Sequence, residues 1–222
     1  MNFSYHLRRP ATPPSHRPPL LVLLHGKGAN EENLFELAQY FDPRFMVISL
    51  RAPHEMAPGY YRWYERTETA QGSIFDEAEI EASRLWLIQA INDAVMALGA
   101  DPHQVHILGF SQGGAMALAL ALTAPRHLRS VVSIAGRLLA ASAPFAAPAE
   151  AMNHLTLLIQ HGTQDEMVPY AESVAACALF AELGVKLGFK EYGAGHTISP
   201  AMLKDALDFL RVQLDAAQDG PL

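Results

Sequence analysis

Short apolar runs alternate along this chain with segments in which apolar residues recur at helical spacing. The runs cover residues 20–24, 45–50, 105–108, 130–135, 155–160 and 185–192. Most of them consist largely of hydrophobic residues, which is typical of strands buried on both faces of a parallel sheet. Spacing of three and four residues predicts helices at residues 31–41, 76–98, 113–122, 170–183 and 200–214. The alternation predicts an α/β fold with a mostly parallel central sheet and helices on both faces.

The whole chain, residues 1–222, is expected to form a single domain. Its 222 residues are enough for one full hydrophobic core. Within residues 1–19 we expect an edge strand at residues 2–8 and then a surface connection that contains five prolines. Residues 215–222 are polar and are expected to form a frayed tail.

The turn after the third buried run fits the motif Gly-x-Ser-x-Gly, with Gly109, Ser111 and Gly113 at the fixed positions. In a nucleophile elbow the serine occupies a strained turn, and the glycines let strand and helix approach closely. The motif alone is short, and its alternative is a glycine-rich turn with an incidental serine. A buried strand before it and an alanine-rich helix after it favour the nucleophile.

A serine hydroxyl needs a base, and the base needs a carboxylate that orients it. Of the ten histidines, His196 follows the last strand in the glycine-bounded turn Gly-Ala-Gly-His, which can bring its ring to Ser111. Asp165 follows the fifth apolar run, at the same end of the sheet. Glu166 and two aspartates of the last helix compete for this role, but they are expected to face solvent. We therefore predict Ser111, His196 and Asp165 as nucleophile, base and orienting carboxylate.

An oxyanion hole needs two backbone N–H groups that point at the developing alkoxide. One is expected from Gln112, directly after the nucleophile and at a helix N-terminus. The other is expected from Lys27, in the turn that follows residues 20–24. Gly26 and Gly28 flank Lys27 and permit a tight backbone turn there.

Charge and cysteine content exclude several other classes. The net charge of −7 argues against a nucleic-acid partner. The single Cys177 permits no disulfide within the chain, which fits a cytoplasmic location. The apolar runs are too short for an integral membrane span. Metal-ligand spacings of His and Cys are absent near the expected site, so we expect neither a metal nor an organic cofactor.

Four motifs follow one another along the chain: Leu24-His25-Gly26-Lys27-Gly28, Gly109-Phe110-Ser111-Gln112-Gly113-Gly114, His161-Gly162-Thr163-Gln164-Asp165-Glu166-Met167-Val168-Pro169 and Gly195-His196. In these motifs the sequence resembles the phospholipase/carboxylesterase family of α/β-hydrolases, which includes acyl-protein thioesterases and small bacterial carboxylesterases. The resemblance runs from about residue 20 to residue 210, with all four motifs in order. It implies the α/β-hydrolase fold, the triad Ser111, Asp165 and His196, and an oxyanion hole from the Lys27 and Gln112 amides.

One departure from the family pattern bears on the substrate. The thioesterase branch usually has an acidic residue directly after the His-Gly-x-Gly turn, whereas this chain has Ala29. The sequence therefore looks closer to the bacterial carboxylesterase branch. We expect a serine esterase that cleaves short- to medium-chain carboxylic esters through an acyl-enzyme and loses activity below about pH 6.5, where a histidine base becomes protonated. The alternatives are a lysophospholipase or acyl-protein thioesterase with a longer groove and, more remotely, a non-catalytic protein that binds a small ligand.

Specificity is expected to come from two loops, residues 52–75 and 136–153, because no large cap domain fits in this length. We expect an open, shallow site for a small-molecule ester or thioester. Family members are often dimers, so the resemblance also implies a homodimer as one possible assembly. The side chains expected to line the acyl groove are Trp63, Phe75, Leu138 and Met167.

Overall fold

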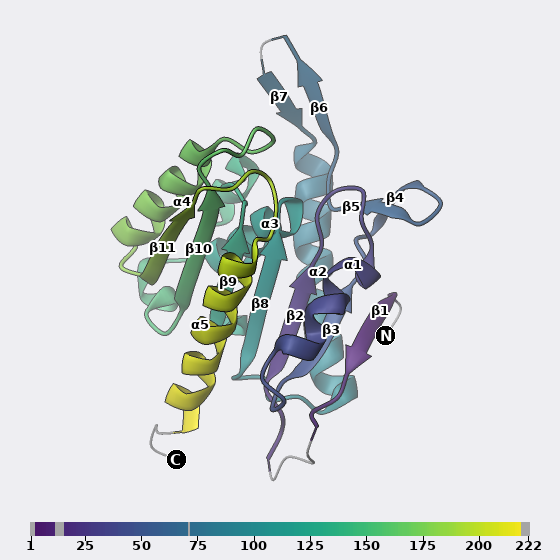
Figure 1. Cartoon of the computed structure of the whole chain (residues 1–222), viewed down its shortest axis with the longest axis vertical. Helices are drawn as coiled ribbons and strands as arrows, with labels where there is room; N and C mark the ends of the chain where they lie inside the picture. The colour runs from purple at the N-terminus through teal and green to yellow at the C-terminus, as the bar shows by residue number, and fades with distance from the viewer. Residues whose placement is uncertain (1–2, 12–15, 71, 219–222) are drawn as a thin grey trace.

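The computed structural model describes residues 3–11, 16–70 and 72–218, and its centre is a seven-stranded sheet (Figure 1). The strand order is β1-β3-β2-β8-β9-β10-β11. β1 runs antiparallel to β3, and the other neighbouring strands are parallel. This confirms the predicted mostly parallel sheet. Of the edge strand expected at residues 2–8, the structure has Tyr5–Arg8 as β1, and residue 2 lies outside the described part. The strands are β1 (Tyr5–Arg8), β2 (Leu20–Leu24), β3 (Met46–Leu50), β8 (Val105–Phe110), β9 (Ser130–Ile134), β10 (Thr156–Gly162) and β11 (Lys186–Tyr192).

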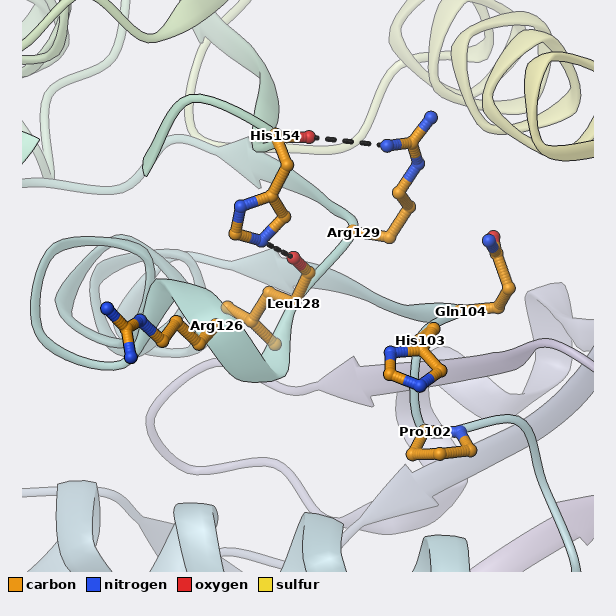
Figure 2. Close-up of a pocket in the computed structure, with 7 residues that line it drawn as sticks. All are labelled: Pro102, His103, Gln104, Arg126, Leu128, Arg129 and His154. Atoms are coloured by element: carbon orange, nitrogen blue, oxygen red, sulfur yellow. Dashed lines mark hydrogen bonds between the residues drawn. The ribbon is translucent and has the colours of Figure 1, made fainter. Parts of the chain in front are cut away.

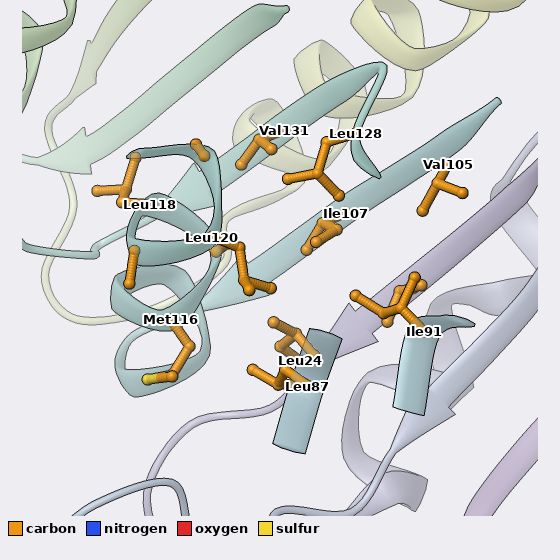
Figure 3. Close-up of a cluster of buried hydrophobic side chains, with 14 of the residues drawn as sticks. Leu24, Leu87, Ile91, Val105, Ile107, Met116, Leu118, Leu120, Leu128 and Val131 are labelled. Atoms are coloured by element: carbon orange, nitrogen blue, oxygen red, sulfur yellow. The ribbon is translucent and has the colours of Figure 1, made fainter. Parts of the chain in front are cut away.

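Helices cover both faces of the sheet and create two hydrophobic cores. Side chains alternate between the two faces along a strand, so Leu20 and Val22 face one core and Leu21 and Leu23 face the other. Figure 3 shows the first core, where strand residues such as Ile107 lie against helical leucines. The first core is covered by α2 (Glu77–Leu98), α3 (Gln112–Thr123) and α4 (Tyr170–Glu182), and the second by α1 (Glu31–Phe35) and α5 (Pro200–Gln218).

The first predicted loop contains two β-hairpins. β4 (His54–Ala57) pairs with β5 (Tyr60–Arg62), and β6 (Arg66–Thr69) pairs with β7 (Gly72–Phe75). These short strands are largely exposed and polar, so they carry no buried apolar run that would reveal them in the sequence. The β6–β7 hairpin projects beyond the end of the sheet at which the parallel strands terminate (Figure 1).

Three other boundaries differ from the expectations. The second predicted loop is partly wound into two 3₁₀ turns, Ala140–Phe145 and Ala149–Met152. The helix expected at residues 31–41 ends at Phe35 and continues as a 3₁₀ helix over Glu36–Tyr40. α5 extends to Gln218, so the frayed tail expected from residue 215 is wrong for its first four positions, and residues 219–222 lie outside the described part. Within the described ranges, no helix has both the length and the apolar composition to cross a membrane.

Candidate active site

Ser111 occupies a sharp turn between β8 and α3, with φ 56° and ψ −118°. This left-handed φ is costly for a residue with a side chain, and such strain is concentrated at functional sites. A Cβ on Gly109 would lie 2.2 Å from the Gly113 carbonyl oxygen, and one on Gly113 would lie 2.0 Å from the Leu24 carbonyl oxygen. Both glycines are therefore needed for strand and helix to meet, and the turn projects the serine from the carboxyl end of the sheet.

Three residues that are far apart in the sequence meet at this turn. His196, in the loop between β11 and α5, has its Nε2 atom 2.9 Å from the Ser111 Oγ atom. Its Nδ1 atom lies 2.7 Å from Asp165 Oδ2. A carboxylate accepts a hydrogen bond from Nδ1–H, which keeps the proton on Nδ1 and leaves Nε2 with the lone pair that can accept the serine proton. The arrangement can therefore remove a proton from Ser111 during nucleophilic attack.

Asp165 is held as an anion beneath His196. Its carboxylate has no exposed surface, and Oδ1 accepts the backbone N–H groups of Met167 and Val168, each at 2.9 Å. Burial opposes ionisation, but the hydrogen bonds from Val168, His196 and Met167 outweigh it and hold the pKa of Asp165 below its ordinary value. A negative charge in this position stabilises a protonated His196.

The two expected oxyanion amides lie in the turns after β2 and β8. Gln112 begins α3, where the first amides of a helix have no partner within it. Within the described residues, the Lys27 amide donates no hydrogen bond. Gly28 beside it has φ +76°, which glycine tolerates without strain. The Lys27 side chain forms an ion pair with Glu65 at 3.0 Å, so its ammonium group points away from the turn.

The four side chains expected to line a groove have different surroundings. Met167 has a side chain that is 58% exposed, and its backbone N–H is one of the two that hold Asp165. Phe75 and Leu138 are half-buried against the first core. Trp63 is fully buried, so the expectation that it lines an open groove needs correction. Its indole packs near His25 and donates a hydrogen bond to a backbone carbonyl, as buried tryptophans usually do.

Further contacts surround the three central residues, and sequence reasoning missed the first of them. The Phe110 ring lies beside the His196 imidazole, with ring centroids 4.9 Å apart. The His161 Nε2 atom lies 3.3 Å from Asp165 Oδ2 and 2.9 Å from the Val168 carbonyl oxygen. The position of His161 directly after the fifth apolar run was the available signal for its contact. No local pattern indicates which distant residue a ring or a side-chain amide will contact.

A cavity of about 300 Å³ lies far from this site, at the amino-terminal ends of β8, β9 and β10 (Figure 2). Arg126 and Arg129 line it, but their guanidinium groups point in different directions in Figure 2. Their charges therefore do not converge on one ligand. In the part of the chain that the structure describes, no group of three or more potential metal ligands was found.

Comparisons with known proteins give the family to which the chain belongs. A model of the Phospholipase/Carboxylesterase family matches residues 11–214. The chain belongs to this family. The carboxylesterase SOBER1 of Arabidopsis thaliana is 37% identical over 135 residues, which cover 60% of this chain and 58% of that protein. Acyl-protein thioesterase 1 of Eremothecium gossypii is 32% identical over 221 residues, with 90% of each chain covered.

The chain is also similar to a solved structure of an esterase. The crystal structure of esterase PE8 superimposes with a TM-score of 0.81 at 26% identity and covers 96% of this chain and 99% of that one. The fold is thus the α/β-hydrolase fold, as the resemblance implied. As a member of the phospholipase/carboxylesterase family, the protein is a carboxylic ester hydrolase.

Proposed function

We propose that the protein is a serine carboxylesterase in which Ser111, His196 and Asp165 form the catalytic triad. The observation that carries this proposal is the 2.9 Å contact between His196 Nε2 and Ser111 Oγ at the apex of the elbow. The buried carboxylate on the other ring nitrogen supports it, because it selects the tautomer that can act as a base.

The proposed reaction has two halves. Ser111 Oγ attacks the ester carbonyl carbon while its proton moves to His196 Nε2, and the carbonyl π electrons move to the oxygen. The Lys27 and Gln112 amides stabilise that oxyanion, each by about 3 kcal/mol. The intermediate then collapses as the bond to the alcohol breaks, and His196 returns the proton to the leaving alcohol. Water, deprotonated by His196, attacks the acyl-enzyme in the same way and releases the carboxylic acid and free Ser111.

We further propose that the acyl group is short to medium in length. Met167 offers exposed apolar surface beside Asp165, whereas Phe75 and Leu138 are half-buried against the first core. The two loops that carry Phe75 and Leu138 form only short hairpins and 3₁₀ turns. Longer acyl chains are the second candidate, as in a lysophospholipase or an acyl-protein thioesterase. The Eremothecium gossypii relative, which is named a thioesterase, supports this candidate.

The test is a series of p-nitrophenyl esters from acetyl to palmitoyl, assayed for a burst and for steady-state turnover. We expect a burst of p-nitrophenol with wild type, none with Ser111→Ala, and the highest kcat/KM at four to eight carbons, roughly the length that a shallow groove covers. An optimum at palmitoyl esters would favour the thioesterase or lysophospholipase activity. Absence of turnover together with no labelling by a fluorophosphonate would contradict the triad and favour ligand binding alone.

The remaining sequence expectations are also proposals. A homodimer is tested by sedimentation equilibrium, and a cytoplasmic location by cell fractionation. Full activity after treatment with a chelator is the expected result for an enzyme that needs no metal.

A further inference from the structure

One short segment, which begins at Tyr61 in β5, contacts both turns that carry the proposed oxyanion amides. Its first contact is with the turn after β2. The Gly28 amide donates to the Tyr61 carbonyl at 2.8 Å, and the Tyr61 amide donates to the Ala29 carbonyl at 2.9 Å. This small antiparallel bridge fixes the residues that directly follow Lys27.

Trp63 holds the same turn from its other side. Its indole Nε1–H donates to the His25 carbonyl at 2.7 Å, two residues before Lys27. The indole is fully buried between the His25 ring, at a centroid distance of 5.4 Å, and the Trp86 ring, at 6.2 Å. A large side chain packed in this way has little freedom to move, so the hydrogen bond positions the His25 peptide firmly.

The Gln112 side chain ties the second turn to the same segment. Its Oε1 atom accepts the Trp63 backbone N–H at 3.1 Å, and its Nε2 atom donates to the Tyr64 carbonyl at 2.8 Å. Gln112 is buried, and both ends of its amide are satisfied. The residue whose backbone N–H is a proposed oxyanion donor is therefore fixed by its own side chain to the segment that also fixes the Lys27 turn.

We propose that Trp63 and the Gln112 side chain are positioning residues that set the distance between the Lys27 and Gln112 amides. This inference rests on the proposed function. Both donors must lie close to 3 Å from a single oxygen atom in the transition state, yet they belong to turns on two different strands. Pairing of β2 with β8 aligns the strand ends but not the turns beyond them. The Trp63 and Gln112 bonds supply the missing connection, which we call the oxyanion brace.

The test replaces Gln112 by methionine, which keeps the backbone amide and the side-chain length but removes both side-chain hydrogen bonds. We expect kcat to fall about 10- to 100-fold while KM stays within about threefold, because the two amides move relative to each other. Affinity for a trifluoromethyl ketone, which forms a tetrahedral oxyanion on Ser111, should fall in proportion. The pH profile should keep its shape, because His196 and Asp165 are unchanged.

Gln160→Met is the matched control. Gln160 is also buried and donates to the Tyr192 hydroxyl at 2.6 Å and to the Met202 carbonyl at 3.1 Å, away from the proposed oxyanion hole. It should lower the Tm but leave kcat and the affinity for the ketone within about twofold of wild type. If it lowered kcat as much as Gln112→Met does, the brace would be overturned, because the loss of buried side-chain hydrogen bonds anywhere in the molecule would then lower kcat.

Trp63→Phe tests the brace without altering residue 112. It removes the indole N–H but keeps most of the packing, and we expect kcat to fall about 5- to 20-fold with the same loss of ketone affinity. If Gln112→Met does not fold, Trp63→Phe alone tests the oxyanion brace. Wild-type kcat and ketone affinity in a folded variant overturn the brace, whereas a wild-type protein without a burst on any ester overturns the proposed function itself.

Discussion

Among the described residues, two of the serine–histidine contacts lie along β8 and the turn after it, and only the contact in the turn is proposed to be catalytic. At the carboxyl end of β8, His196 Nε2 lies 2.9 Å from Ser111 Oγ. In the sheet interior, His106 Nδ1 lies 2.7 Å from Ser130 Oγ, between neighbouring residues of β8 and β9. Both His106 and Ser130 are fully buried, so a substrate cannot reach them. A serine next to a histidine is therefore not sufficient to define an active site.

The pairs differ in what holds the second ring nitrogen. In the outer pair, Asp165 accepts a hydrogen bond from His196. In the interior pair, His106 Nε2 is buried without a partner among the described residues. Burial and, to a smaller extent, the charge of Arg129 lower the pKa of His106 to about 3. His106 therefore stays neutral, and no carboxylate stabilises the imidazolium that general-base catalysis creates.

The largest expected effect comes from making the outer pair resemble the interior one. Asp165→Asn keeps the side-chain shape but removes the charge and the selection of the His196 tautomer, so we expect kcat to fall about 10⁴-fold at neutral pH. Asp205→Asn is the control, because Asp205 on α5 forms an ion pair with Lys190 on β11 at 2.8 Å, away from Ser111. This substitution should change kcat less than about twofold. Steady-state hydrolysis of a p-nitrophenyl ester measures both, and a loss of less than tenfold for Asp165→Asn would contradict the role of the carboxylate.

The two pairs also differ in their backbone, because Ser111 lies in a tight turn where strand and helix are in close contact. Gly113→Ala places a Cβ 2.0 Å from the Leu24 carbonyl oxygen, so we expect a loss of about 3 kcal/mol or more in the free energy of unfolding. Gly188→Ala is the control, since its Cβ would meet only Leu158 Cδ1 at 3.5 Å. Its stability should change by about 0.5 kcal/mol at most, because the lower entropy of the unfolded chain offsets any small strain in the folded strand. Urea unfolding compares the two, and equal stabilities would refute the steric argument.

The interior pair should affect how the free energy of unfolding depends on pH, and it should not affect the catalytic activity. In the unfolded chain a histidine binds a proton below about pH 6.5, whereas folded His106 resists protonation until about pH 3. The unfolded state thus binds more protons in this window, and the free energy of unfolding falls as the pH drops. His25, whose pKa burial lowers to about 4, acts in the same direction. Asp165 contributes at lower pH, because its pKa lies below the ordinary value of 3.8.

The double variant His106→Leu/Ser130→Ala removes both polar partners, which limits the cost of leaving one unpaired. Between pH 6.5 and 4.5 we expect wild type to lose about 2 kcal/mol more than the variant in the free energy of unfolding. Urea titrations at the two pH values measure this difference. The variant should hydrolyse esters at the wild-type rate at neutral pH, and an unchanged pH slope would show that His106 does not resist protonation.

The outer pair was predictable from sequence and its surroundings were not, for a physical reason. Ser111, Asp165 and His196 each follow a strand, and parallel strands bring their carboxyl ends to one edge. Local patterns therefore place all three together. The roles of Trp63 and the Gln112 side chain depend on contacts with segments 38 and 49 residues away, which leave no local periodicity. The two hairpins were not predicted either, because exposed polar strands have the same sequence pattern as loops.

The smallest expected effect concerns access to the outer pair. Met167 is 58% exposed beside the loop that holds Asp165, so an acyl chain that crosses it would bury part of its side chain. Met167→Ala removes roughly one to two buried methylene contacts, about 1 kcal/mol, and should lower kcat/KM for an octanoyl ester about fivefold while the acetyl ester is unaffected. Met96→Ala, at an 80% exposed position on α2, is the control and should change neither value. An unchanged octanoyl-to-acetyl ratio in Met167→Ala would remove Met167 from the groove and leave Phe75 and Leu138 as its proposed lining.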